Sequence, residues 1–143
     1  SFAVLAGAAA VDPAISREAL LLPIVVFLWT PPHFWSLAIA AQESYAAAKV
    51  PMLPVIAGNA LTARVILAHT AVLAALSVVP GFMSMGWIYL ACAAVGGAIF
   101  TATSIRLVLR PDRKHAIQNF LASLLQLVLL LSGTVADRLI GGL

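Results

Sequence analysis

The sequence has very few charged side chains. Lys, Arg, Asp and Glu make up 9% of its 143 residues, whereas hydrophobic residues make up 63%. A soluble globular domain usually has about a quarter of its residues charged. The shortage of charge therefore indicates a chain embedded in a lipid bilayer rather than a soluble domain.

Cysteine is nearly absent too, because Cys92 is the only one and it lies in an apolar segment. A single cysteine excludes a disulfide or a cysteine-ligated metal site within the chain, so Cys92 is expected to be a small core residue. The sequence also lacks a long basic run and a soluble domain, so nucleic acid is not an expected partner. Phosphate loops, nucleophile elbows and zinc motifs are missing as well.

What the sequence does contain is long apolar runs. Four of them approach the roughly 20 residues that a membrane-spanning helix needs: 20–41, 65–83, 85–105 and 117–136. The apolar run at residues 2–11 is too short, and we expect it to be the cut end of a longer helix. These runs predict an all-α, polytopic transmembrane bundle with four full spans and a truncated N-terminal helix. Residues 1–143 are expected to be the C-terminal part of a single larger membrane domain.

The helix ends are predicted from capping and breaking residues. Ser16 is expected to cap the first full span, and Thr62 the second. Pro80 followed by Gly81 is expected to end the second span. Residues 42–60 and 110–115 are expected to be the polar loops that follow the first and third spans.

The distribution of Lys and Arg predicts the orientation. Loops 42–60 and 110–115, with the helix ends beside them, hold most of the basic residues: Lys49, Arg64, Arg106, Arg110, Arg113 and Lys114. The opposite side receives only Arg17 and Arg138. By the positive-inside rule both loops face the cytoplasm and so share one surface. Trp87 and Tyr89 are expected in the aromatic belt of the opposite interface.

The first span holds an unusual Pro-Pro-His triplet. Pro31 and Pro32 remove two backbone donors and should kink the helix. An ionisable group inside a span, such as His33, is a candidate functional residue. Ser36 and Glu43 would lie on the same side as His33 if the helix continued that far. Two interpretations of His33 remain open: it satisfies the carbonyls that the prolines free, or it contacts a ligand.

Each of the charged or polar residues in the loops beside these spans also has two possible interpretations. Glu43 and Lys49 are either solvated loop charges, or Glu43 helps to hold Mg²⁺ and Lys49 contacts a phosphate. Tyr45 is either an interfacial anchor or a hydrogen-bond donor to a leaving group. Arg113 and Lys114 either report topology alone or gather a polyanion at the mouth of a cavity.

Polar residues inside the later spans are expected to serve packing. His69 lies in the second span, and Asn119, Ser123 and Gln126 share one face of the fourth. We expect these side chains to form hydrogen bonds between helices.

The motif F-L-W-T-P-P-H-F-W-S-L-A-I-A, followed by E-S-Y and V-P-M-L-P-V, resembles the protoheme IX farnesyltransferase (heme O synthase) family of the UbiA prenyltransferase superfamily. Ala116, Phe120 and Ser123 match the spacing that opens the last helix of that family, and Asp137 matches its closing acid. The likeness covers nearly the whole chain. It implies the second half of a nine-helix membrane enzyme.

The resemblance also implies an activity. Enzymes of this family join the farnesyl group of farnesyl diphosphate to the 2-vinyl group of heme b, forming heme O. Mg²⁺ is held with the diphosphate by two acidic motifs on cytoplasmic loops, the second of which maps onto Glu43, Ser44 and Tyr45. The family usually has Asp at the position of Ser44, so Glu43 must supply the carboxylate. Implied partners are the two substrates, membrane lipid, and heme A synthase or oxidase assembly proteins.

The roles that this resemblance assigns fall into two groups. The residues expected in catalysis are Glu43, also the metal ligand, Tyr45 and Lys49. The residues expected to bind substrate are His33, Trp35, Arg113 and Lys114. Two alternatives remain: a UbiA-type enzyme with an aromatic or quinone-precursor acceptor, and a catalytically silent membrane assembly protein with the same fold. Ser44 keeps the last alternative open.

Overall fold

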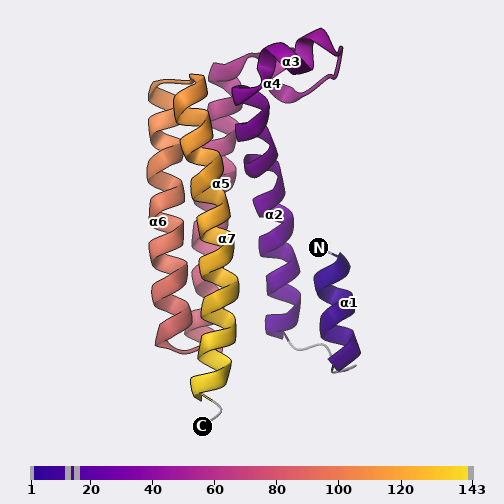
Figure 1. Ribbon diagram of the computed structural model, residues 1–143. Helices are drawn as coiled ribbons and strands as arrows, with labels where there is room; N and C mark the ends of the chain where they lie inside the picture. Colours follow the sequence, from indigo (N-terminus) through magenta and orange to yellow (C-terminus); the bar gives the residue numbers. More distant parts are fainter. Residues whose placement is uncertain (1, 12–13, 15–16, 142–143) are drawn as a thin grey trace.

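The protein is an all-helical bundle in its computed structural model, which describes residues 2–11, 14 and 17–141 (Figure 1). Four helices in this part of the chain are long and apolar enough to cross a membrane. They are α2 (Arg17–Ala40), α5 (Asn59–Met83), α6 (Trp87–Leu109) and α7 (Arg113–Gly141). The predicted all-α bundle with four spans is therefore confirmed.

Three shorter helices complete the described part of the chain. Helix α1 (Phe2–Val11) lies beside the beginning of α2, as predicted for a short N-terminal helix (Figure 1). Helices α3 (Gln42–Ala47) and α4 (Leu53–Ala57) lie together at the opposite end of α2. The prediction of an irregular loop over residues 42–60 was wrong, because two short helices occupy much of that segment.

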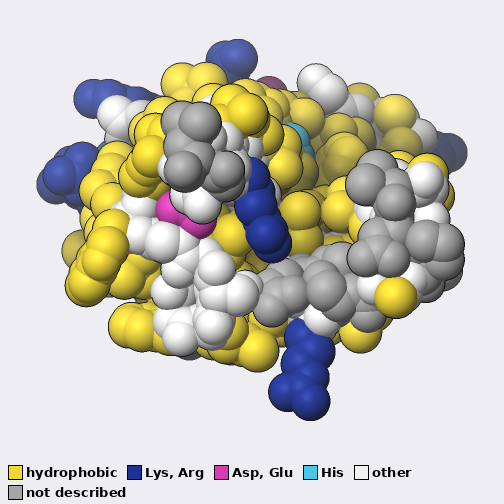
Figure 2. All heavy atoms as spheres, turned by 90° about the horizontal axis from the view of Figure 1, so that it is seen from below, with side chains coloured by type: hydrophobic (Ala, Val, Ile, Leu, Met, Phe, Trp, Pro, Cys, Tyr) yellow, Lys and Arg dark blue, Asp and Glu magenta, His cyan; other side chains and the backbone are white. Residues whose placement is uncertain are grey.

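Hydrophobic side chains cover most of the surface. Seen from the end opposite α3 and α4, the described surface is mainly apolar, with Lys and Arg side chains near its centre and projecting around its rim (Figure 2). Many large side chains on the sides of the bundle are exposed, among them Phe27, Leu121 and Val135. Such a surface is costly in water and suits lipid or further protein, as expected of a multi-pass membrane protein.

The two predicted ends of α5 were wrong. Helix α5 begins at Asn59 after Gly58, whose φ of 85° lies in the left-handed region that glycine adopts without strain. Thr62 lies inside the helix and donates to the Gly58 carbonyl at 2.8 Å instead of capping it. Helix α5 also continues through buried Pro80 to Met83. Prolines are tolerated inside membrane helices because neighbouring groups compensate for the lost backbone hydrogen bond.

Three further predictions about helix ends can be compared with the structure. The loop at 110–115 is shorter than predicted, because α7 already begins at Arg113. Trp87 is 84% exposed at the start of α6, which agrees with an interfacial position, but Tyr89 is fully buried. The Tyr89 hydroxyl donates to the Ser77 carbonyl at 2.7 Å, so the prediction of an interfacial Tyr89 was wrong. The predicted cap Ser16 lies outside the described residues.

A buried carboxamide connects all four spans. Asn119 of α7 donates from Nδ2 to Ser36 Oγ of α2 at 2.8 Å. Its Oδ1 accepts from Ser104 Oγ and Thr103 Oγ1 of α6 at 2.9 and 2.8 Å. Ser104 Oγ in turn lies 3.2 Å from Thr70 Oγ1 of α5. Asn119 is fully buried, so these contacts replace water as its partners.

The prediction of interhelical hydrogen bonds is confirmed for Asn119 but not for every residue it named. Ser123 also pairs with α2, where the Trp29 indole donates to the Ser123 carbonyl at 2.9 Å. His69 instead pairs with the Val65 carbonyl of its own helix. Gln126 is buried and neither atom of its amide has a hydrogen-bond partner among the described residues.

The far end of the bundle is fixed by one carboxylate. Asp137 Oδ2 of α7 accepts the backbone N–H of Gly86 at 2.6 Å, immediately before α6. A negative charge at this position complements the positive end of the α6 dipole. A methyl group at Gly86 would meet Asp137 Oδ1, so a larger residue at this position would displace the carboxylate from its place. The acidic residue that the resemblance singled out therefore joins α6 to α7.

Replacing Asn119 with Leu should destabilise the bundle. The substitution leaves Ser36 and Ser104 without their buried partner, and each lost interhelical bond is worth about 0.6 kcal/mol in a membrane protein. We expect a loss of about 1–2 kcal/mol in the free energy of unfolding, measured by detergent-induced unfolding of the full-length protein. Gln118→Leu is the matched control, because Gln118 is the exposed neighbouring amide. Equal stability of the two variants would contradict the role of Asn119.

Candidate functional site

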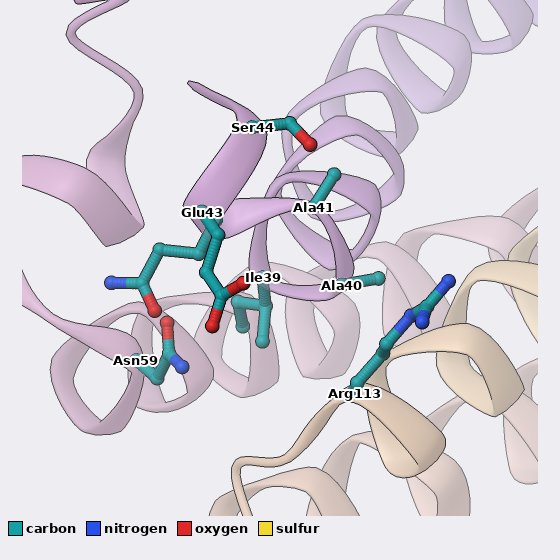
Figure 3. Close-up of a pocket in the computed structure, with 8 residues that line it drawn as sticks. Ile39, Ala40, Ala41, Glu43, Ser44, Asn59 and Arg113 are labelled. Carbon is teal, nitrogen blue, oxygen red and sulfur yellow. The ribbon is translucent and has the colours of Figure 1, made fainter. Parts of the chain in front are cut away.

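A polar pocket of about 490 Å³ lies at the end of the bundle where α2 stops and α7 starts (Figure 3). Its walls come from the end of α2, from α3, and from the first residues of α5 and α7. The residues that line it are Ile39, Ala40, Ala41, Gln42, Glu43, Ser44, Asn59 and Arg113. The two segments that were predicted to share one surface, 42–60 and 110–115, therefore meet in this pocket.

Glu43 lies in the pocket because the chain turns between α2 and α3. Helix α2 ends at Ala40, and the backbone turns at Ala41 before α3 begins, with Glu43 in its first turn. The side chain of Gln42 holds α3 against α4, because its Nε2 donates to the Pro54 carbonyl at 2.8 Å. His33, Ser36 and Glu43 therefore do not form one continuous helical stripe, because the helix does not persist to Glu43.

The acidic and the basic side chain of the pocket lie on opposite sides of it. Glu43 and Asn59 lie on one side, and Arg113 lies on the other side, beyond Ala40 (Figure 3). Within the described residues neither Glu43 nor Arg113 takes part in a salt bridge. The carboxylate and the guanidinium are therefore both available to a ligand.

Hydrogen bonds at Asp112 fix the start of α7 and thus the position of Arg113. Asp112 Oδ1 accepts the backbone N–H of His115 at 2.9 Å and the imidazole Nδ1–H at 2.6 Å. The first of these is the hydrogen bond of an N-cap, which satisfies a backbone donor that the helix leaves free. The backbone hydrogen bond, followed by that of the imidazole, lowers the pKa of the exposed Asp112 carboxyl below its usual value.

The other predicted site residues near the pocket do not line it. Tyr45 is half-buried on α3, whereas Lys49 and Lys114 are exposed. Lys49 has a φ of 57°, in the left-handed region, and the Val50 N–H closes this turn on the Tyr45 carbonyl at 3.0 Å. A non-glycine residue in that conformation carries about 1–2 kcal/mol of strain. The roles predicted for these three residues remain predictions.

His33 lies between α2 and α7 in an aromatic stack. Its imidazole is stacked on Trp29 and on Phe120, with ring centroids 4.1 and 4.6 Å away. Its Nδ1 lies 2.6 Å from Ser123 Oγ, and Ser123 Oγ donates to the Phe120 carbonyl at 2.6 Å. With its hydroxyl proton used in that way, Ser123 must accept the Nδ1–H of His33. The imidazole therefore pairs with a side chain of α7 rather than with the carbonyls that the prolines free.

Trp35 belongs to a second, apolar groove on α2. This groove of about 450 Å³ is lined by Phe27, Thr30, Pro31, Phe34 and Trp35. The Trp35 ring also meets the His69 imidazole edge-on at 5.3 Å. The structure thus brings Glu43 and Arg113 together, and places His33 and Trp35 further along α2.

The pocket contains oxygen ligands of the kind that Mg²⁺ prefers. The described residues hold no group of three His, Cys, Asp or Glu that could form a metal cage. They do offer the Glu43 carboxylate, the Ser44 hydroxyl and a buried, unpaired Asn59 Oδ1. Mg²⁺ is commonly held by one or two carboxylates together with substrate phosphates, so this set fits Mg²⁺ when a diphosphate is bound.

Sequence reasoning missed Gln42 and Asn59. Both residues lie within the predicted loop 42–60, and neither was assigned a role there. The dipeptide Gly58-Asn59 favours a turn, and Gly58 separates α4 from α5. The Asn59 side chain points toward α3 because α3 and α4 fold back over the start of α5 (Figure 3). That arrangement could not be predicted from the turn alone.

Comparison with known proteins shows which family this architecture belongs to. A model of the UbiA prenyltransferase family matches residues 1–130. Protoheme IX farnesyltransferase 2 of Paramagnetospirillum magneticum is 54% identical over 99% of this chain and 49% of its own length. Protoheme IX farnesyltransferase 1 of the same organism is 47% identical over 96% of this chain and 49% of its own.

A more distant relative agrees with these two. Protoheme IX farnesyltransferase of a Roseiflexus species is 42% identical over 98% of this chain, which covers 26% of that protein. The chain thus spans about half the length of the first two relatives and a quarter of the third. No solved structure gives a significant match.

The lowered pKa of Asp112 predicts that the start of α7 is sensitive to acid. A carboxyl whose pKa is lower in the folded state stabilises that state above its unfolded pKa, and the effect is lost as the pH falls through the folded pKa. The hydrogen-exchange protection factor of the His115 amide should therefore be high at neutral pH and fall in acid. Asp112→Ala should remove this protection at neutral pH.

Asp112→Asn is the control, because it keeps a capping oxygen but does not titrate. It should retain most of the protection at every pH. Full protection in Asp112→Ala would show that the cap does not hold the first turn of α7.

Proposed function

This chain belongs to the UbiA prenyltransferase family, and on that premise we propose that the full-length protein transfers the farnesyl group of farnesyl diphosphate to the 2-vinyl group of heme b, forming heme O. The observation that carries the proposal is the pocket that Glu43 and Arg113 both line. Relatives named protoheme IX farnesyltransferase favour heme over an aromatic or quinone-precursor acceptor. They also favour an enzyme over a silent assembly protein.

The pocket is proposed to bind the diphosphate end of the substrate. Glu43 would hold Mg²⁺, which when bound neutralises charge on the departing diphosphate. Arg113 stabilises the same negative charge from the opposite side of the pocket. Tyr45, Lys49 and Lys114 lie outside the pocket wall. Lys49 and Lys114 would attract the polyanion to the pocket mouth, and Tyr45 would donate a hydrogen bond to the part of the diphosphate that extends beyond the wall.

The transfer itself is an alkylation led by ionisation. The allylic C–O bond breaks, and its electron pair leaves with the diphosphate. The vinyl π electrons of heme b form the new C–C bond, and the cation left on the porphyrin side chain takes up water and loses a proton. Phe34 and Trp35, in the apolar groove of α2, would shelter the farnesyl cation through their π faces. Exclusion of bulk water matters because water would otherwise trap the cation first.

His33 is proposed to contact the heme. Its Nδ1–H is engaged by Ser123 and both ring faces are covered, so the Nε2 lone pair is the remaining polar group of the imidazole. A neutral imidazole nitrogen of this kind is a common ligand of heme iron. The hydrogen bond from Nδ1 to Ser123 Oγ would hold the ring in a fixed orientation.

We place the pocket on the cytoplasmic side of the cell inner membrane. The basic residues near it follow the positive-inside rule, and both substrates would enter from the membrane or the cytosol. The product would pass to a heme A synthase or to proteins of oxidase assembly.

Glu43→Gln tests the diphosphate site. Removing the carboxylate charge should lower heme O formation by on the order of 100-fold, as loss of one preorganised electrostatic contact does. The assay is heme O formation by the full-length protein from heme b, farnesyl diphosphate and Mg²⁺. Gln118→Leu, outside the pocket, should keep normal activity. A parallel loss of activity and folded yield in Glu43→Gln would make Glu43 structural instead.

His33→Phe tests the heme contact. Phenylalanine keeps an aromatic ring between Trp29 and Phe120 but has no nitrogen for iron. The Soret band of heme b bound to the full-length protein should shift, and heme affinity should fall. Ser123→Ala should keep the iron ligand and produce a smaller change. An unchanged Soret band in His33→Phe would exclude His33 as an axial ligand.

A further inference from the structure

The side-chain oxygen of Asn59 is an unusual feature of the pocket. Asn59 Oδ1 is buried and accepts no hydrogen bond from any described residue. Leaving such an acceptor unpaired is energetically costly, so buried carbonyl oxygens normally have a partner. Asn59 forms part of the pocket wall, so a ligand in the pocket can supply this partner.

The surroundings of Asn59 are rich in oxygen. Its amide and the carboxylate of Glu43 lie on the same side of the pocket (Figure 3). Gln42 lines the pocket as well and brings a third side-chain oxygen to it, while one N–H of its Nε2 donates to the Pro54 carbonyl. The cationic group of the pocket, Arg113, lies on the opposite side. Oxygens gathered in this way repel one another unless a cation lies among them.

The backbone holds Asn59 firmly in place. It is the first residue of α5, and Gly58 before it has the left-handed φ of 85° that reverses the chain after α4. Thr62 fastens the same turn through its hydrogen bond to the Gly58 carbonyl. A ligand on a fixed helix end loses little conformational entropy when it binds an ion.

We propose that Asn59 is a second protein ligand of the divalent cation at Glu43, through its side-chain oxygen. The inference rests on the proposed function, because it concerns the same pocket. A hard cation such as Mg²⁺ accepts amide carbonyl oxygens as well as carboxylates. Asn59 would offset the carboxylate that this chain lacks at Ser44, so that one acidic and one neutral oxygen, with the diphosphate, hold the ion.

The experiment measures the affinity of the pocket for a divalent cation and does not depend on the prenyl transfer. Mn²⁺ replaces Mg²⁺ as a paramagnetic probe, and its binding to the full-length protein in nanodiscs is followed by electron paramagnetic resonance with inorganic diphosphate present. Asn59→Leu removes the oxygen at similar side-chain size. We expect it to weaken Mn²⁺ binding by on the order of tenfold, the lower end of what loss of a supporting group at a metal site costs.

Two further variants make the test specific. Asn59→Asp keeps an oxygen in place and adds a negative charge, so it should bind Mn²⁺ as tightly as the parent or more tightly. An acidic residue is also favourable in the first turn of α5, so the helix should tolerate it. Gln118→Leu makes the same amide-to-leucine change outside the pocket and should leave Mn²⁺ affinity unchanged. Thermal unfolding without metal checks that each variant is folded.

Two results would overturn the inference. In the first, Asn59→Leu binds Mn²⁺ like the parent, whether or not Glu43→Gln weakens binding. In the second, Asn59→Asp loses as much affinity as Asn59→Leu, which would mean that Asn59 acts as a hydrogen-bond donor to Glu43. The proposed reaction is tested by a different measurement, the formation of heme O. Absence of heme O would reject that reaction without changing what the Mn²⁺ affinities say about Asn59.

Discussion

The structure depends on one buried carboxamide. Asn119 reaches Ser36 on α2 and Ser104 on α6, and Ser104 continues the contact to Thr70 on α5. In a bilayer the hydrophobic effect does not choose between one helix neighbour and another, because lipid is as apolar as a leucine side chain. Directional hydrogen bonds among buried polar groups can make that choice, and Asn119 joins all four spans at a single level.

The hydrogen bonds around Asn119 lie between the pocket and the middle of the bundle. Ser36 is one turn from the end of α2, and Asn119 is less than two turns from the start of α7. The hydrogen bond between them therefore holds together the two helix ends from which Glu43 and Arg113 extend. At the far end, Asp137 fixes α7 to the start of α6 in the same manner. Packing along the spans and chemistry at the pocket are linked through these few polar contacts.

Hydrophobicity predicted the spans well, because a helix that crosses a bilayer must be apolar over most of its length. Polar positions were harder to interpret. The shared face of Asn119 and Ser123 was predictable from helical periodicity, but the unpaired Gln126 and the buried Tyr89 were not. Their surroundings depend on which helices are neighbours. Pro80 was misread as a helix end because the signal holds in water, whereas a membrane helix can continue through proline.

The pocket was predictable only in part. The acidic loop and the basic loop were expected on one surface, and they meet there. The fold of α3 against α4 was not expected, and it places Asn59 beside Glu43 while Tyr45 and Lys49 lie off the pocket wall. Short helices of this kind are set by contacts such as that of Gln42 with Pro54, which no local pattern reveals.

The central claim is that α3 and the first turn of α7 bind one diphosphate together. Hydrogen exchange of the full-length protein, with and without Mg²⁺ and inorganic diphosphate, tests it most directly. The account predicts that the amides of Gln42–Ala47 and those next to Arg113 become protected at the same diphosphate concentration. Protection of one segment without the other, or of neither, would contradict it.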